Sequence, residues 1–342
     1  MTLAERLSAA PGVVAGVSVA GERDVAAAGL ANVRSGRAMS PSLTIPVASL
    51  TKPVLATAVV RLMRQRRLSL ATPVVKLVPA LAPDWRAAPG LTLAHVLSHT
   101  SGLRPDIPLD EAASYGDGDD ALEQAVRATV RRGQVLRLGS AWQYGNAGYA
   151  LAGHALGSLS WSTFEQALAT AVLVPAGMGR AGFGEPEALG HAHGQPVGGT
   201  YFRARRPGGG LIASVDDMLS FAEWAMDDQE TLAVTGRPVA ASQLGSRYGL
   251  GWNLSHGRRV LWHTGDWGGC HSALLLAPAS RVAVVVVVND DAAVRLRRDL
   301  AWAELTRLTG LWRPRLAPGL RIAQSLARGA LASLTRPRPA DG

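Results

Sequence analysis

Ser49-Leu50-Thr51-Lys52 is the most informative stretch of the chain, because it places a hydroxyl and an amine three residues apart. It opens an apolar-periodic segment that continues to Arg67, and this periodicity predicts a helix. Pro53 fits the first turn of such a helix, where backbone N–H groups lack helical partners. Residues three apart share one helix face, so the Lys52 amine can approach the Ser49 hydroxyl.

This pair of side chains is suited to nucleophilic catalysis. A serine becomes a good nucleophile only when a neighbouring base takes its proton. An ordinary lysine, with a pKa of about 10.4, is protonated at neutral pH, but burial and nearby cations lower that pKa. Neutral Lys52 can then accept the proton of Ser49, and the helix N-terminus can stabilise an oxyanion. Taken alone, the spacing also fits a capping serine followed by a surface lysine.

The scarcity of lysine makes Lys52 more informative. The chain carries 35 Lys and Arg against 26 Asp and Glu, and its lysines are Lys52 and Lys76 alone. Arginine cannot release its proton in a protein, whereas lysine can. A lysine kept next to a potential nucleophile therefore favours a proton-transfer role.

Two further triplets extend this candidate site. In Tyr144-Gly145-Asn146, the tyrosine can hold a proton as phenol or phenolate, and the amide can contact Lys52 and an acyl amide. His263-Thr264-Gly265 precedes an expected strand, whose edge can supply N–H groups to an oxyanion hole. Each triplet alone is typical of an ordinary turn. Together, in this order, they indicate a serine-nucleophile site.

Strand patterns at both ends of the chain enclose a largely helical middle. We therefore expect an α+β fold, an antiparallel sheet flanked by helices, with a cleft at the seam. The prediction is a single catalytic domain over 1–310, with its sheet part at about 10–60 and 245–310, a helical insertion at about 61–244, and a basic extension at 311–342. Expected strands are 13–19, 24–29, 248–253, 272–276 and 282–288; expected helices are 49–67, 93–99, 119–132, 149–159, 162–173, 216–226 (capped by Ser214), 290–308 and, weakly amphipathic, 320–334.

The three motifs in the order S-x-x-K, Y-x-N, H-T-G resemble those of the class C β-lactamase family, which includes penicillin-binding carboxypeptidases, esterases and transacylases. The similarity extends from about Pro11 to Leu308. Other matching segments are Leu97 to Leu103 (L-S-H-T-S-G-L), Gly208 to Leu211 followed by Ser214 and Asp217 (G-G-L-x-S-x-x-D-M), and Tyr248 to Trp252 (Y-G-L-G-W).

This resemblance implies a β-lactamase/transpeptidase-like fold that uses no metal and no organic cofactor. It implies a structural role for His99, which would otherwise be a tempting triad histidine. The implied site residues are Ser49 as nucleophile, Lys52 and Tyr144 as the proton-handling pair, Asn146 as a substrate contact, the N–H groups of Ser49 and Asp266 as the oxyanion hole, and His263, Thr264 and Gly265 beside the substrate.

Two departures from the family pattern bear on function. His263 stands where many β-lactamases of this type have lysine, and histidine is charged only part of the time near neutral pH. A weaker charge for a substrate carboxylate favours an ester, lactone or amide over efficient β-lactam hydrolysis. The segment Leu68 to Val74 lacks the family's aspartates, which we interpret as a local structural change.

The expected function is a serine hydrolase that forms an acyl-enzyme with a small-molecule acyl substrate. One alternative is a biosynthetic acyltransferase that passes the acyl group to an amine or alcohol. Another is a non-catalytic ligand-binding relative. A Cys270–His271 enzyme is disfavoured, because neighbouring residues of a strand point to opposite faces.

The charge and composition of the chain limit the binding partners and the cellular location that the sequence predicts. The net charge of +9 supports only non-specific attraction to nucleic acid, and the chain lacks zinc spacing and an aromatic-basic RNA signature, so we expect no specific nucleic-acid partner. No apolar run is long enough for a transmembrane segment, and the N-terminus lacks a secretory pattern. With one cysteine, these features predict a cytoplasmic location.

Overall fold

The computed structural model describes residues 3–7, 12–198, 201–242 and 246–313, and it is built around one antiparallel sheet. The two ends of the chain meet in the middle of this sheet, because β1 pairs with β13. In spatial order the nine strands of this sheet are β3 (Arg37–Ala38), β2 (Glu22–Asn32), β1 (Gly12–Val19), β13 (Val282–Val288), β12 (Cys270–Ala277), β11 (Val260–Trp267), β10 (Asn253–Ser255), β9 (Arg247–Tyr248) and β8 (Ala240–Ala241).

The central strand β13 shows why the sheet is covered on both faces. All seven of its residues are buried, and successive side chains of a strand point to opposite faces. Val282, Val284, Val286 and Val288 pack with α12 (Val294–Thr309), whereas Ala283, Val285 and Val287 join the core on the other face, with α10 (Val215–Asp227). A valine-rich strand is therefore stabilised by helices on each side.

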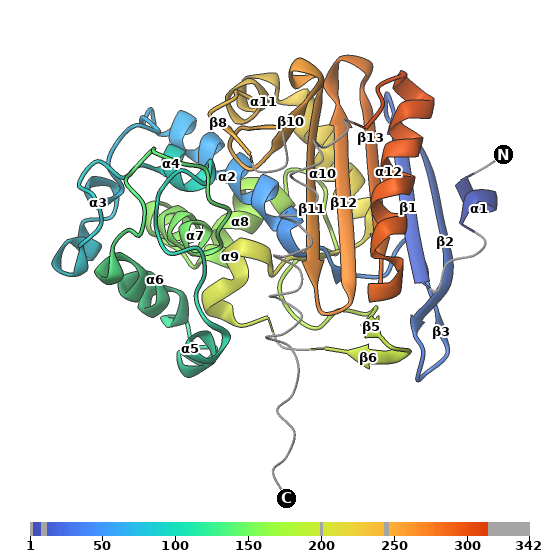
Figure 1. The fold of residues 1–342 in the computed structure, drawn as a ribbon, viewed down its shortest axis with the longest axis horizontal. Coiled ribbons are helices and arrows are strands. Elements are labelled where there is room, and N and C mark those ends of the chain that lie inside the picture. The colour runs from blue at the N-terminus through green and yellow to red at the C-terminus, as the bar shows by residue number, and fades with distance from the viewer. Residues whose placement is uncertain (1–2, 8–11, 199–200, 243–245, 314–342) are drawn as a thin grey trace, which may run out of the picture.

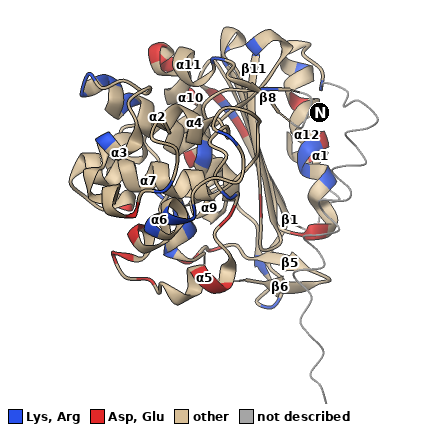
Figure 2. Ribbon diagram, turned by 60° about the vertical axis from the view of Figure 1, so that its left-hand side comes forward, with Lys and Arg blue, Asp and Glu red and all other residues tan. Residues whose placement is uncertain are grey.

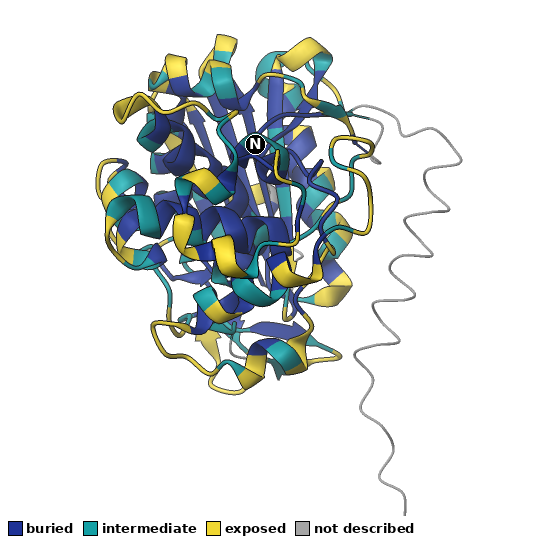
Figure 3. Ribbon diagram, turned by 90° about the vertical axis from the view of Figure 1, so that its left-hand side faces the viewer, coloured by how far each residue is buried: buried dark blue, intermediate teal, exposed yellow. Residues whose placement is uncertain are grey.

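The remaining helices pack mainly beside the sheet as a separate helical part (Figure 1). Figure 3 shows the buried interior that continues from this part to the sheet. Helix α1 (Leu3–Arg6) contributes to the α12 side. The others are α2 (Thr51–Gln65), α3 (Val74–Leu77), α4 (Leu93–Leu97), α5 (Leu109–Ser114), α6 (Ala121–Arg132), α7 (Ala147–Ser160), α8 (Phe164–Leu168), α9 (Arg206–Gly209) and α11 (Gln229–Thr235).

Two small two-stranded sheets complete the fold. Strand β4 (Ile45–Pro46) pairs with β7 (Ile212–Ala213), and β5 (Gly190–Ala192) pairs with β6 (Gln195–Val197). The first pair brings the segment before Ser49 next to the segment after the three glycines 208–210. Two motifs that are remote in sequence thereby meet beside strands β11 and β12.

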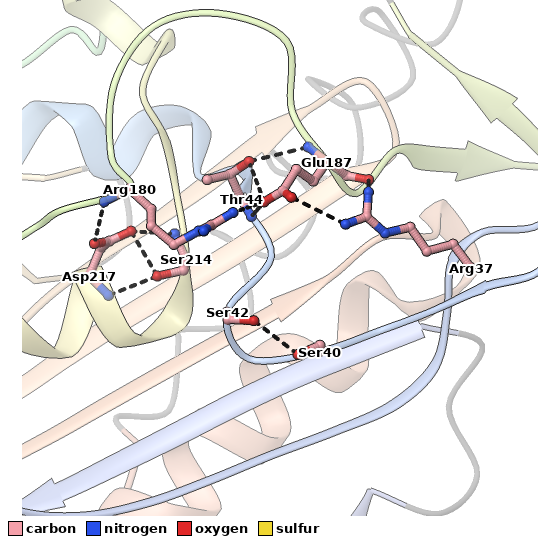
Figure 4. A network of polar contacts seen from close by, with 8 residues as sticks. All are labelled: Arg37, Ser40, Ser42, Thr44, Arg180, Glu187, Ser214 and Asp217. Carbon is pink, nitrogen blue, oxygen red and sulfur yellow. Dashed lines mark hydrogen bonds and ion pairs between the residues drawn. The ribbon is translucent and has the colours of Figure 1, made fainter.

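Ser214 and Asp217, which match the family's G-G-L-x-S-x-x-D-M segment, have a structural role. The Ser214 hydroxyl accepts the Asp217 N–H at 3.0 Å, and the Asp217 carboxylate accepts the Ser214 N–H at 2.9 Å. This capping box starts α10, as the sequence predicts. The Asp217 carboxylate also accepts the backbone N–H of Arg180. The Arg180 guanidinium forms an ion pair with the Glu187 carboxylate, which also accepts the backbone N–H of Thr44 (Figure 4).

The α+β fold class predicted from the sequence is confirmed, but several element boundaries are wrong. The expected strand 248–253 is two strands, β9 and β10, since Gly251 has φ +80 and the chain turns there. The expected helix 162–173 consists of two parts. The α-helix α8 ends at Leu168, and a π-helical turn follows from Ala169 to Leu173. Glu22 and Arg23 belong to β2, because the hairpin turn is only Ala20-Gly21.

Parts of the expected helical insertion belong with the sheet. Both α10 and β8 lie within 61–244, yet α10 packs on β1 and β13, and β8 extends the sheet. The possible helix at 320–334 lies outside the described residues. Within the described ranges, no helix combines the length and apolar character needed to cross a bilayer. Charged residues of both signs are interspersed over the helices and loops (Figure 2).

Candidate active site

Ser49 lies in a short 3₁₀ turn, Ala48–Leu50, immediately before α2. Ala48 has φ +48, a left-handed conformation that is uncommon for a residue with a side chain. Lys52 follows in the first turn of α2 and is fully buried. Its Nζ lies 3.0 Å from Ser49 Oγ, so the predicted approach of amine and hydroxyl is present in the structure.

The surroundings of Lys52 match a neutral amine. Its Nζ contacts Asn146 Oδ1 at 2.8 Å and, still closer, the Gly208 carbonyl oxygen. A neutral amine can donate to these two acceptors and keep its lone pair for the Ser49 hydroxyl. Burial lowers the pKa of Lys52 to about 7; Asp106 opposes this shift, and the Arg205 cation adds to it.

Tyr144 makes the second side-chain contact with Ser49. Its hydroxyl donates to Ser49 Oγ at 2.8 Å, and the residue as a whole is 37% exposed. Burial of the hydroxyl, followed by the effect of Tyr248, raises the pKa of Tyr144 well above its ordinary value. Of the two protonation states that the sequence leaves open, the phenol is therefore the one present near neutral pH.

A chain of polar contacts fixes the amide of Asn146. Its Nδ2 donates to Asp106 Oδ1 at 3.3 Å, and Arg205 Nη2 donates to Asp106 Oδ2 at 2.9 Å. With the amide nitrogen held by Asp106, the amide oxygen is turned toward Lys52. Neither Asp106 nor Arg205 carries a sequence signal, because each stands outside the three motifs.

The backbone of the three glycines 208–210 lies too close to neighbouring side chains for larger residues to fit. A Cβ at Gly208 would lie 3.0 Å from Asn146 Oδ1, and a Cβ at Gly209 would lie 2.5 Å from the Tyr201 hydroxyl. Larger residues would displace the carbonyl that contacts Lys52. Sequence comparison with the family singled out this segment without assigning it a role in the site.

Strand β11 brings the third motif to the nucleophile. A Cβ at Gly265 would lie 2.8 Å from the backbone nitrogen of Ser49, so glycine permits this contact. Ser272 on the neighbouring strand donates to the Val47 carbonyl at 2.7 Å and ties the two segments together. The triplet 263–265 precedes β12 as expected, but it also lies within a strand of its own, β11, which the sequence analysis did not predict.

His263 is neutral in this environment. It is 2% exposed, and its Nδ1 lies 2.8 Å from the Thr264 carbonyl, which assigns the proton to Nδ1. Nε2 then accepts from the Tyr248 hydroxyl at 3.2 Å. Burial, with the Lys52 charge as a second cause, lowers the pKa of His263 to about 3. Near neutral pH this position supplies no cation to a substrate carboxylate.

His99 packs against the ring of Tyr144. Its ring lies 4.5 Å from the Tyr144 ring centroid, and its Nδ1 accepts the Gly145 N–H at 3.3 Å. Burial lowers the pKa of His99 well below its ordinary value. These contacts support the implied structural role, which is to position the Tyr144 loop.

Asp266 and Cys270 point away from the nucleophile. The Asp266 carboxylate contacts His271 Nδ1 at 2.6 Å and Arg297 Nη1 at 2.9 Å, so only its backbone is available to the site. Cys270 is buried in the core, and burial raises the pKa of its thiol. His271 is engaged by Asp266 and Asp291 instead of the cysteine.

Residues of the metal-binding types do not form a cluster of three or more anywhere in the described ranges. A serine in contact with a lysine and a tyrosine beside an antiparallel sheet, with helices on both faces, defines the class of β-lactamase/transpeptidase-like serine hydrolases. The family model described as Beta-lactamase matches residues 2–308. The chain belongs to this β-lactamase family.

Individual relatives differ in their named activities. The chain is 28% identical to penicillin-binding protein 4 of Amycolatopsis lactamdurans, over 89% of this chain and 87% of that protein. It is 31% identical to esterase EstB of Burkholderia gladioli, over 72% and 76%. A class C β-lactamase of known structure matches with a TM-score of 0.76 at 19% identity, covering 88% of this chain and 92% of that one, a likeness that shows the fold.

Proposed function

We propose that this protein hydrolyses an ester, lactone or amide through an acyl-enzyme on Ser49. The observation that carries the proposal is the position of Ser49 Oγ, 3.0 Å from the Lys52 amine and 2.8 Å from the Tyr144 hydroxyl. One contact offers a base and the other an acid, both within proton-transfer distance. The family includes an esterase, EstB, among the relatives of this chain.

The first half-reaction follows from these contacts. Neutral Lys52 takes the hydroxyl proton of Ser49 while Ser49 Oγ attacks the acyl carbon. The N–H groups of Ser49 and Asp266 stabilise the oxyanion, and the Tyr144 hydroxyl lies where it can protonate the leaving group. The proton gained by Lys52 restores the phenol, which leaves the acyl-enzyme with both side chains in their starting states.

Water is the acceptor that we infer for the second half-reaction. A transferase would have to keep water away from its acyl-enzyme. The Lys52–Tyr144 pair then takes a proton from water and returns one to Ser49. An acyltransferase would use the same acyl-enzyme with an amine or alcohol in place of water.

Intact-protein mass spectrometry on the wild-type chain tests the proposal. We expect activated esters to give a single acyl adduct that peptide mapping places on Ser49. Adding a saturating amine or alcohol should leave free acid as the main product; an amide or a new ester as the main product would identify a transferase. An unmodified mass across a broad panel of esters and β-lactams would instead favour a non-catalytic binder.

His263→Lys should shift the substrate preference toward carboxylate-bearing β-lactams. A lysine ammonium adds the charge that neutral His263 lacks, and a charge-assisted contact to a carboxylate is expected to raise kcat/KM about tenfold. The matched measurement compares such a β-lactam with its methyl ester, and His263→Gln serves as the neutral control. Equal changes for the acid and the methyl ester would contradict the interpretation of this position.

A further inference from the structure

Arg297 is a buried cation behind the strand that carries the third motif. It lies near the start of α12, is 4% exposed, and reaches the β11–β12 pair from the face opposite the helical part. Its Nη1 donates to the Gly265 carbonyl at 2.9 Å and to the Ser272 carbonyl at 3.1 Å. The motifs in the sequence give no reason to expect a charged side chain at either carbonyl.

The Gly265 carbonyl that accepts from Arg297 belongs to the Gly265–Asp266 peptide, whose N–H is one of the two proposed oxyanion donors. The carbonyl of Gly265 and the N–H of Asp266 belong to one peptide plane, and in a trans peptide they point in opposite directions. The described peptides include no cis bond. Because the carbonyl is directed to Arg297, the Asp266 N–H is directed away from it. Ser49 lies against this part of β11, as the 2.8 Å approach of a Gly265 Cβ to its nitrogen shows.

We infer that Arg297 is a positioning residue for acyl transfer, holding and polarising the Gly265–Asp266 peptide so that its N–H serves as an oxyanion donor. The inference rests on the proposed function of Ser49. A charged donor on a carbonyl strengthens the N–H of the same peptide, since hydrogen bonds in series polarise one another. Arg297 does this without touching the substrate.

The same contacts explain how an aspartate is accommodated at position 266. A carboxylate close to a developing oxyanion would oppose it electrostatically. The Asp266 side chain instead pairs with Arg297 at 2.9 Å and with His271 at 2.6 Å. His271 also contacts Asp291 at 2.9 Å, just before α12. The end of β11 is thus tied to the helix, which restricts movement of the proposed donor.

A pair of substrates that differ in one atom tests the inference. In a thionoester, sulfur replaces the carbonyl oxygen, and sulfur accepts hydrogen bonds weakly. Loss of support for an oxyanion donor should therefore slow the oxygen ester more than the thionoester. The rate of Ser49 acylation is measured with both substrates for the wild type, Arg297→Gln and Arg297→Lys, with Arg295→Gln, an exposed residue of the same helix, as control.

For Arg297→Gln we expect acylation by the oxygen ester to fall on the order of tenfold, less than the hundredfold or more typical of deleting a donor outright. Thionoester acylation should change far less. Arg297→Lys, which keeps the charge, should recover part of the loss, and Arg295→Gln should behave as wild type. Thermal unfolding of each variant identifies those that fold; if Arg297→Gln does not, the oxygen-to-sulfur rate ratio of Arg297→Lys decides.

Equal losses with both substrates would overturn the inference, because they would indicate general damage to the site. An unchanged rate ratio in variants that fold would also overturn it. These failures differ from failure of the proposed function. If the wild type forms no Ser49 adduct, the proposed acyl-enzyme is wrong; if it does, and prefers oxygen over sulfur, only the role of Arg297 is in question.

Discussion

Ser49→Ala is expected to abolish covalent labelling by fluorophosphonates and activated esters and to lower turnover by roughly a thousandfold or more. The reason is that the Ser49 hydroxyl is the group which the Lys52 amine and the Tyr144 hydroxyl both contact. Alanine removes the nucleophile and leaves the lysine and tyrosine in place. The measurement is intact mass after incubation with the probe, together with the initial rate on an activated ester.

Ser140→Ala is the matched control for this variant. Ser140 is exposed, and its hydroxyl donates to the Arg137 carbonyl in a local turn, at a position where we expect no effect on labelling. Labelling that persists in Ser49→Ala and maps to another residue would refute the nucleophile assignment. Full turnover in Ser49→Ala would do the same for the acyl-enzyme mechanism as a whole.

Lys52→Arg should be about as damaging, although it preserves the positive charge. Arginine stays protonated in proteins, so it cannot take the proton of Ser49. We expect a loss of roughly a thousandfold in kcat/KM, with the fold retained if thermal unfolding stays cooperative. Lys76→Arg, which changes the other, exposed lysine, is the control and should match the wild type.

The protonation of Lys52 also predicts the pH dependence of the wild type. With a pKa of about 7, the amine is increasingly neutral as the pH rises through that value. Because the neutral form is the base, kcat/KM should fall as the pH is lowered through about 7 and level off above it. A profile that is flat across neutral pH, or wild-type turnover in Lys52→Arg, would exclude Lys52 as the base.

Much of the fold could be predicted because its signals are local. The valine-rich stretch 282–288 forms β13 at the expected bounds, and Ser214 is the N-cap of α10 as predicted. The predicted strand bounds were wrong where a backbone turn interrupts a segment that has the composition of a strand. Tyr248 to Trp252 has the composition of a strand, yet Gly251 adopts a left-handed conformation and separates β9 from β10.

The sequence alone indicates the family, the α+β class and the approach of Lys52 to Ser49, because a single turn at the start of the helical segment brings residues three apart together, although Ser49 itself lies in the 3₁₀ turn before α2. Only the tertiary structure decided the states of these groups. Burial sets the pKa of Lys52 near 7 and makes His263 neutral. The partners of Lys52 lie 94 and 156 residues away. Such contacts follow from packing, which spacing along the chain does not specify.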